Sequence, residues 1–189
     1  MKTPVRGSAA DSLAYHRLMA KVVPGRFTAA HDDDFVVFLI GMRINRPWKL
    51  RKWLPVFVAM PKMLRELERH PEKGLLGYSQ ALINGGPAVV QYWRSFEDLD
   101  RFARNPDDPH LPAWRRFNAA VGASGDVGIW HETYRVEAGA HEAVYANMPV
   151  VGLASATSHR PAATRGQTAA RRIGIATTDD PVVPSYEDP

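Results

Sequence analysis

Two histidines in this sequence carry the side chain best suited to proton transfer near neutral pH. His131 lies within an apolar segment, beside Trp130, where its imidazole could serve as a general base or bind a metal or a haem iron. His110 follows a proline-rich break and could point into the space between helices and a sheet. Each has a structural alternative: His131 as a partly buried or interface histidine, and His110 as an exposed residue at a helix start.

An arginine and a group of aromatic residues accompany the histidines. Arg43 stands near the end of an apolar segment, where its guanidinium could orient a carboxylate or an enolate, although arginines at such places are often solvated. The aromatic side chains that could line a flat pocket are Tyr92, Trp93, Trp114, Trp130 and Tyr134. Any one of them could equally be core, because aromatic residues are large contributors to interior packing.

The sequence lacks the short motifs of several large enzyme classes. It has no P-loop, dinucleotide fingerprint, zincin motif or nucleophile elbow, and its Gly-Tyr-Ser segment at 77–79 lies within a predicted strand. The absence of cysteine excludes thiol nucleophiles, thiolate metal sites and disulfides. We predict no metal site, and a cysteine-free composition suits a reducing cytoplasm.

Basic residues are concentrated in one short segment of a chain whose net charge is +4. The segment contains Arg43, Arg46, Lys49, Arg51 and Lys52 and no acidic residue. Such a cluster could meet nucleic acid, an anionic lipid surface or an anionic substrate, or it could form a solvated loop and helix start. No nucleic-acid-binding module accompanies it, so we expect no nucleic-acid partner.

No segment of the sequence is apolar for long enough to cross a bilayer. The most apolar segment, 35–40, is far shorter than the ~20 residues that a membrane-spanning helix needs. The N-terminal residues show no apolar run typical of a secretory signal. We expect no membrane span and a cytoplasmic location.

Hydrophobic patterning predicts an alternation of strands and helices. Residues 35–44 form an uninterrupted apolar run, typical of a strand buried on both faces. The stripe from Trp53 to Leu67 predicts a helix, which Pro61 would kink or divide. Residues 75–83 and 88–94 then form a hairpin around the turn signal Asn-Gly-Gly.

The second half of the chain repeats a helix and a strand. Ser95 begins a helix with a capping-box-like pattern, the break at 105–109 interrupts it, and it resumes to about residue 121. Residues 127–136 predict a last strand with two distinct faces. One face presents Trp130, Glu132, Tyr134 and Val136, and the other presents Ile129, His131, Thr133 and Arg135. His131 and Glu132 are therefore not expected to form an acid–base pair.

The order of elements is βαββαβ, which predicts an α+β fold of the ferredoxin-like type. We divide the chain into an N-terminal extension at 1–33, a ferredoxin-like domain at 34–154 and a disordered tail at 155–189. Within the extension, residues 9–23 predict a short helix that Pro24 and Gly25 end. The tail is predicted to be disordered because Ser, Thr, Ala, Arg, Gly and Pro dominate it. With both helices on one face, the other face of the sheet is bare, and pairing two sheets in a homodimer would cover it.

Four segments resemble a bacterial and fungal family that was long labelled a domain of unknown function and later named after a monooxygenase of fumagillin biosynthesis. They are Phe-Leu-Ile-Gly-Met-Arg-Ile at 38–44, Tyr-Trp-Arg-Ser-Phe-Glu-Asp-Leu at 92–99, Gly-Ile-Trp-His-Glu-Thr-Tyr at 128–134 and Val-Tyr-Ala-Asn-Met-Pro at 144–149. The likeness extends from about residue 34 to residue 153. It implies a dimeric α/β barrel related to antibiotic-biosynthesis monooxygenases of secondary metabolism.

The resemblance implies oxidation of an aromatic, quinol or polyketide-type small molecule by molecular oxygen without a bound cofactor. The protein would deprotonate the substrate, exclude water and fix its orientation. Residue chemistry then makes His131 the base and Arg43 the group that stabilises the anion. The substrate-binding residues would be Trp93, Tyr134, Trp114 and His110.

Two other functions fit the same residues. Dimeric α/β-barrel relatives include haem-degrading monooxygenases and haem-dependent aldoxime dehydratases, and His110 or His131 would then be the iron ligand. A dimer that binds a small aromatic molecule without transforming it is the third possibility. The sequence does not distinguish an enzyme from such a binding protein.

Overall fold

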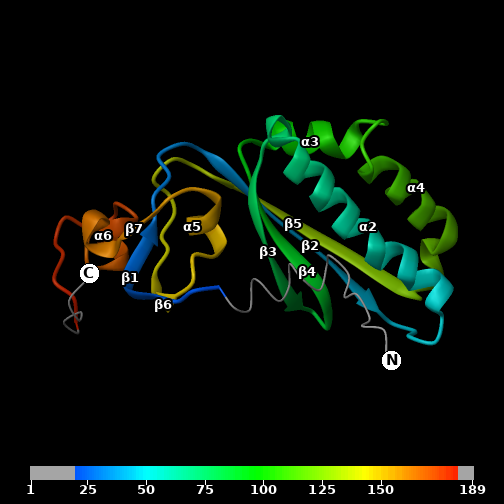
Figure 1. Ribbon diagram of the computed structural model, residues 1–189, viewed down its shortest axis with the longest axis horizontal. Coiled ribbons are helices and arrows are strands. Elements are labelled where there is room, and N and C mark those ends of the chain that lie inside the picture. Colours follow the sequence, from blue (N-terminus) through cyan, green and yellow to red (C-terminus); the bar gives the residue numbers. More distant parts are fainter. Residues whose placement is uncertain (1–19, 183–189) are drawn as a thin grey trace, which may run out of the picture.

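The computed structural model describes residues 20–182 and places a four-stranded antiparallel sheet at the centre of the larger lobe (Figure 1). The strands, in spatial order, are β3 (Leu75–Ile83), β4 (Gly86–Trp93), β2 (Phe35–Ile44) and β5 (Val127–Val136). The helices on one face of the sheet are α2 (Leu50–Arg69), α3 (Phe96–Arg104) and α4 (His110–Ala120). This is the βαββαβ arrangement of a ferredoxin-like fold, so the predicted fold class is confirmed.

Local sequence signals account for the boundaries of these elements. Asn84 and Gly85 both adopt positive φ, 54° and 77°, as a tight hairpin between β3 and β4 requires. The Ser95 hydroxyl accepts the Asp98 backbone N–H at 3.1 Å and caps α3. Helix α2 continues through both of its internal prolines. Pro61 therefore does not divide the helix. The apolar side chains after it, such as Met63 and Leu67, pack in the core beside the sheet.

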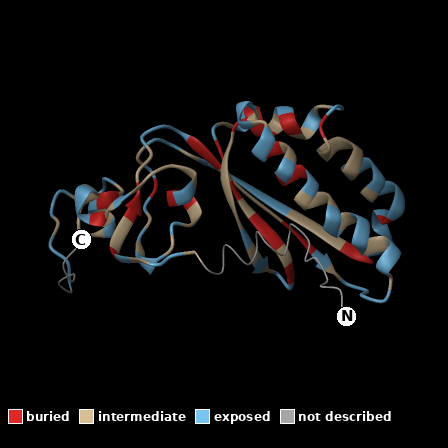
Figure 2. Ribbon diagram, in the orientation of Figure 1, coloured by how far each residue is buried: buried red, intermediate tan, exposed pale blue. Residues whose placement is uncertain are grey.

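The core of this lobe lies between the sheet and the helices. One cluster joins Val36 and Trp93 to side chains of α2 and α3, and a second joins Met42 and Val127 to Val121 after α4. Figure 2 shows the buried segments concentrated along the strands and the sheet-facing sides of the helices. The helices thus cover one face of the sheet, and other segments of the chain contact the second face.

A smaller sheet covers only one end of that second face. Its order is β6 (Tyr145–Met148), β1 (Val23–Ala29) and β7 (His159–Pro161), and the short helix α5 (Gly152–Ala156) follows β6. Phe35 and Ala29 pack there with Leu153 and Ala154 of α5. The rest of the helix-free face, below called the open face, carries no further element within the described residues.

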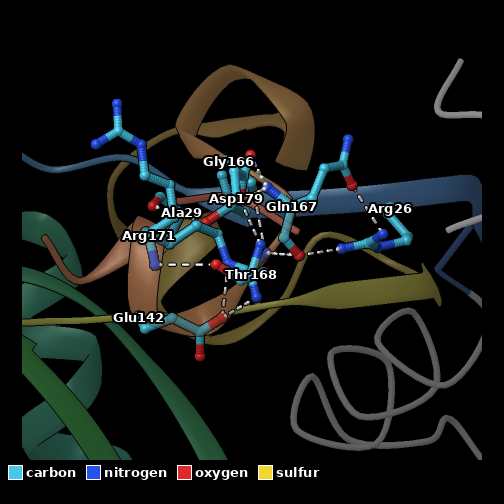
Figure 3. A network of polar contacts seen from close by, with 10 residues as sticks. Arg26, Ala29, Glu142, Gly166, Gln167, Thr168, Arg171 and Asp179 are labelled. Carbon is cyan, nitrogen blue, oxygen red and sulfur yellow. Dashed lines mark hydrogen bonds and ion pairs between the residues drawn. The ribbon is translucent and has the colours of Figure 1, made fainter. Parts of the chain in front are cut away.

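The prediction of a disordered tail from residue 155 is wrong for the part of the tail that the structure describes. Strand β7 pairs with β1, and η3 (Ala162–Arg165) and α6 (Ala169–Arg172) follow it. Many polar contacts hold these residues (Figure 3), in addition to the burial of Ala162 and the stacking of His159 on Phe27. The Arg172 guanidinium donates to the carbonyls of Gly166 and Gln167, each at 2.9 Å, and the Asp179 carboxylate accepts the backbone N–H groups of Gln167 and Thr168.

The N-terminal extension contributes a strand to the smaller sheet where the structure describes it. Residues 23–29 form β1, the central strand of the small sheet, which the sequence did not predict. The helix expected at about 9–23 otherwise lies largely outside the described residues. Within residues 20–182, no helix is both long and apolar enough to cross a membrane.

Candidate functional site

Strand β5 presents its chemistry-bearing side chains on two opposite faces, as predicted. His131 lies opposite Ile40 of β2, on the side of the sheet that carries the helices. Its imidazole is exposed and lies 5.7 Å from the Phe38 ring, centroid to centroid. Within residues 20–182 no hydrogen bond or ion pair holds this ring. His131 is therefore accessible to a small molecule over the outer strand.

The open face carries a second group of β5 side chains. Tyr134 is 51% exposed, and its hydroxyl donates to the Glu132 carboxylate at 2.6 Å. This hydrogen bond, together with the carboxylate charge, raises the pKa of Tyr134. Beside them the Trp130 indole lies over Gly41 of β2, and its Nε1 is buried without a hydrogen-bond partner among the described residues.

Arg43 belongs to the open face and not to the face of His131. It lies opposite Gly128 of β5, three positions along β2 from the partner of His131. Its guanidinium is exposed and close to Gly85 of the hairpin. The predicted base and the predicted anion-binding arginine therefore do not meet within one chain.

Trp93 is a core residue in the structure. It is 0% exposed, packs in the cluster between sheet and helices, and donates from Nε1 to Gln91 Oε1 at 2.9 Å. It also faces the side of the sheet opposite Tyr134, because Trp93 pairs with Val36 and Tyr134 pairs with Val37. The two side chains predicted to form one cavity wall are separated by the sheet.

His110 and Trp114 lie on the outermost helix, α4. The Nδ1 atom of His110 lies 2.9 Å from the Ala103 carbonyl, and its ring lies 6.3 Å from that of Phe102. Trp114 is 43% exposed and stacks on Phe117 with centroids 5.4 Å apart. Both side chains remain on the helix side of the sheet, the side to which His131 belongs.

Two basic residues of the segment at 43–52 form ion pairs with Asp126. The Asp126 side chain, 1% exposed as a residue, binds Arg46 Nη1 and Lys49 Nζ, each at 3.0 Å. The Lys49 hydrogen bond lowers the pKa of Asp126, against the opposing effect of its burial. Lys52 contacts the Ala120 carbonyl. These contacts fix the start of α2 to the loop before β5.

Two polar features in and beside the smaller lobe were not predicted, although Tyr92 was named as a possible pocket residue. Tyr92 and Tyr145 place their hydroxyls near Gly152, and burial raises the pKa of both. A hollow of about 790 Å³ lies beside α6, with Arg165 and Arg171 in its wall, but none of the predicted site residues lines it. Within the described part of the chain, no cluster of three or more His, Asp or Glu side chains could hold a metal ion.

Comparison with known proteins identifies a family to which this chain is similar. Residues 35–153 match the family described as monooxygenase af470-like. The chain is 29% identical over 151 residues to Monooxygenase af470 of Aspergillus fumigatus, which covers 68% of this chain and 53% of that protein. The chain therefore spans about half the length of this curated relative.

Two solved structures are similar to part of this chain. The aldoxime dehydratase OxdRE, in complex with butyraldoxime, is similar with a TM-score of 0.57 and 14% identity, over 74% of this chain and 42% of that one. SnoaB, a cofactor-independent oxygenase from Streptomyces nogalater, is similar with a TM-score of 0.38 and 12% identity, over 53% of this chain and 91% of that one. At these identities the first likeness shows a shared fold and nothing about activity.

The family match extends from the first residue of β2 to Leu153 in α5, so it includes the whole central sheet, its three helices and the strand that carries His131. Because these residues make up more than half of the sequence, the chain belongs to the monooxygenase af470-like family.

Proposed function

We propose that the protein is a monooxygenase that uses molecular oxygen without a bound cofactor on an electron-rich aromatic, quinol or polyketide-type molecule. The family to which the chain belongs supports the reaction class. The location of the site is supported by one observation: the His131 ring is exposed, lies beside Phe38 and makes no hydrogen bond or ion pair within the described residues. An apolar ring next to a base suits a flat substrate that must lose a proton.

The proposed chemistry needs only a base, oxygen and a substrate that supplies the electrons. His131 removes a proton from an activated CH₂ group, and the carbanion reduces oxygen by one electron before the two radicals combine into a peroxide. The peroxide then loses water as the second C–H proton departs, so CH₂ and O₂ become C=O and H₂O. The substrate provides all the electrons, and the protein positions and deprotonates it.

Oxygen uptake with a panel of anthrones and hydroquinones tests this proposal. His131→Ala should lower the rate by about 10²-fold or more, and added imidazole should restore part of it, because a general base contributes on this scale. His70→Ala is the matched control, since His70 lies at the end of α2 and pairs with Glu66 and Glu72. Full activity in His131→Ala, or no rescue by imidazole, would exclude His131 as the base.

We further propose that the open face pairs with a second copy of the chain. Small and apolar side chains such as Val90, Ala81 and Leu39 lie there, and Tyr134 is half exposed. A dimer would cover these side chains and remove their apolar surface from water. Light scattering should give a dimeric mass that Val90→Lys abolishes. Thr133→Lys, on the other face of β5, should leave it unchanged.

One contact favours haem binding as the second candidate function. A carbonyl can only accept, so the His110 Nδ1–H donates to Ala103, and a hydrogen bond of this kind orients many metal-binding histidines. His110 would hold the iron, which would supply redox or Lewis-acid chemistry. Haemin added to the protein should then give a Soret band that His110→Ala loses and His131→Ala keeps. A colourless protein would exclude this candidate.

A further inference from the structure

Helix α2 has a second apolar stripe that does not face the sheet. The inner stripe packs in the core through residues such as Trp53, Met63 and Leu67. The outer stripe and the tryptophan before it, together called the α2 ridge, are Trp48, Leu50, Leu54, Phe57 and Val58, which are 74%, 56%, 47%, 45% and 40% exposed. Residues 50, 54, 57 and 58 follow helical spacing along one side. A soluble surface seldom groups so many large apolar side chains.

The charge around the ridge has one sign. From residue 35 to residue 65 the sequence contains no Asp or Glu. Arg46 and Lys49 of this segment are bound by Asp126. Four exposed cations of the helix are held by no ion pair within residues 20–182: Arg51, Lys62, Arg65 and Arg69. The first three lie in the segment without acidic residues. The ridge is therefore an apolar strip flanked by uncompensated positive charge.

The shape of the ridge distinguishes among partners. It is the convex side of a single helix, and Figure 2 shows much of the outer surface of α2 as exposed. Protein partners of an amphipathic helix usually offer it a groove, and a second copy of this chain would bring another positive ridge against it. A lipid surface adapts to a convex apolar strip and supplies negative phosphates to its flanks.

We propose that the α2 ridge binds the surface of a membrane that contains anionic lipids. Leu50, Leu54 and Phe57 enter the boundary between headgroups and acyl chains. Trp48 lies at headgroup depth, where tryptophan side chains concentrate. The flanking Arg51, Lys62 and Arg65 pair with lipid phosphates. This surface is independent of the proposed oxidation chemistry at His131.

Vesicle flotation of the intact protein tests the proposal. The protein should float with phosphatidylcholine vesicles that contain about 30% phosphatidylserine, and at least fivefold less with phosphatidylcholine alone. Binding should fall steeply between about 0.1 and 0.5 M NaCl, because salt screens exposed charges. Equal binding to both kinds of vesicle, or no binding to either, would overturn the proposal.

Two sets of variants separate the apolar and the basic contributions. Leu54→Ser with Phe57→Ser, and separately Arg51→Gln with Arg65→Gln, should each reduce binding to the anionic vesicles about tenfold. The matched controls are Ile175→Ser, a residue 80% exposed in the smaller lobe, and Arg135→Gln with Arg160→Gln. Circular dichroism melting confirms that each variant is folded.

Light scattering on the same variants gives a second decisive outcome. If Leu54→Ser with Phe57→Ser converts an oligomer to a monomer, the ridge is an interface between protein chains and the lipid proposal fails. If the ridge variants bind anionic vesicles as well as the controls do, the proposal also fails. An unchanged mass together with lost vesicle binding is the result that we expect.

Discussion

The guanidinium of Arg172 is bound to the Glu142 carboxylate, with Nε 2.8 Å and Nη2 2.6 Å from Oε1. Its remaining Nη1 donates to two backbone carbonyls of the segment before α6. Arg172 is 7% exposed, so these bonds are shielded from water. One arginine thus ties the last described segment of the chain to the residues just before β6.

Removal of this arginine should release the C-terminal segment. Arg172→Met keeps the apolar stem but leaves two carbonyls and a carboxylate without their donor, which we expect to cost about 2–4 kcal/mol of stability in the smaller lobe. Hydrogen exchange should show faster exchange from residue 159 to 179 than in the matched Arg160→Met. Unchanged exchange in Arg172→Met would show that the polar network does not order this segment.

The contact between Gly41 and Trp130 makes a second prediction. A Cβ atom at residue 41 would lie 2.7 Å from the Trp130 ring, so Gly41→Ala must displace the indole from the open face. We expect a loss of about 1–3 kcal/mol in the free energy of unfolding. Trp130→Ala combined with Gly41→Ala should show a coupling of at least about 0.5 kcal/mol in a double-mutant cycle. Simple additivity would mean that the ring does not pack on Gly41.

The sequence predicted the elements of the fold whose side chains follow a regular pattern of apolar residues. Strands β2, β3 and β5 begin and end where the apolar runs predicted, and the two faces of β5 follow from simple alternation. The smaller lobe was not predictable in this way. Its order depends on Arg172 and Asp179, which bond to the backbone of Gln167 across 5 and 12 residues, and composition alone gives no sign of such bonds.

The candidate site was predictable only in part for a related reason. Alternation within one strand tells which residues share a face, but it does not tell how the faces of two strands correspond. The register that places Arg43 opposite Gly128 puts Arg43 and His131 on different faces. Trp93 likewise became core because its strand pairs centrally between β3 and β2. Tyr134 on the edge strand stayed half exposed.

Asp126 gives a prediction for acid stability. Its pKa is lowered, chiefly by the Lys49 hydrogen bond, so its contribution is fully present above the unfolded-state pKa near 3.8 and is lost as the pH falls below that value. Asp126→Asn should lower Tm at pH 7 and lose less further stability between pH 5 and pH 2. Asp100→Asn, which removes only the exposed pair with Arg104, is the control for Tm at pH 7. An unchanged Tm in Asp126→Asn would show that the pair is not stabilising.

His141 should make the smaller lobe sensitive to mildly acidic pH. The residue is 8% exposed, packs edge-on against Phe35, and has both ring nitrogens buried. Burial lowers its pKa below the usual 6.5, and the nearby charges of Arg165 and His31 act in the same direction, while Asp32 and a backbone hydrogen bond with Ala29 oppose them.

The sign of this effect follows from proton uptake. Below about pH 6.5 the unfolded chain binds a proton at residue 141 that the folded chain still excludes, so stability falls as the pH drops from 6.5 toward the lower folded-state pKa. His141→Phe, which preserves an aromatic ring against Phe35, should flatten the dependence of urea-unfolding free energy on pH between 7 and 5. Adding His159→Phe should flatten it further, because burial lowers the pKa of His159 as well. If both variants keep the slope of the wild-type protein, the buried imidazoles are not its source, and the decline must come from groups elsewhere in the chain.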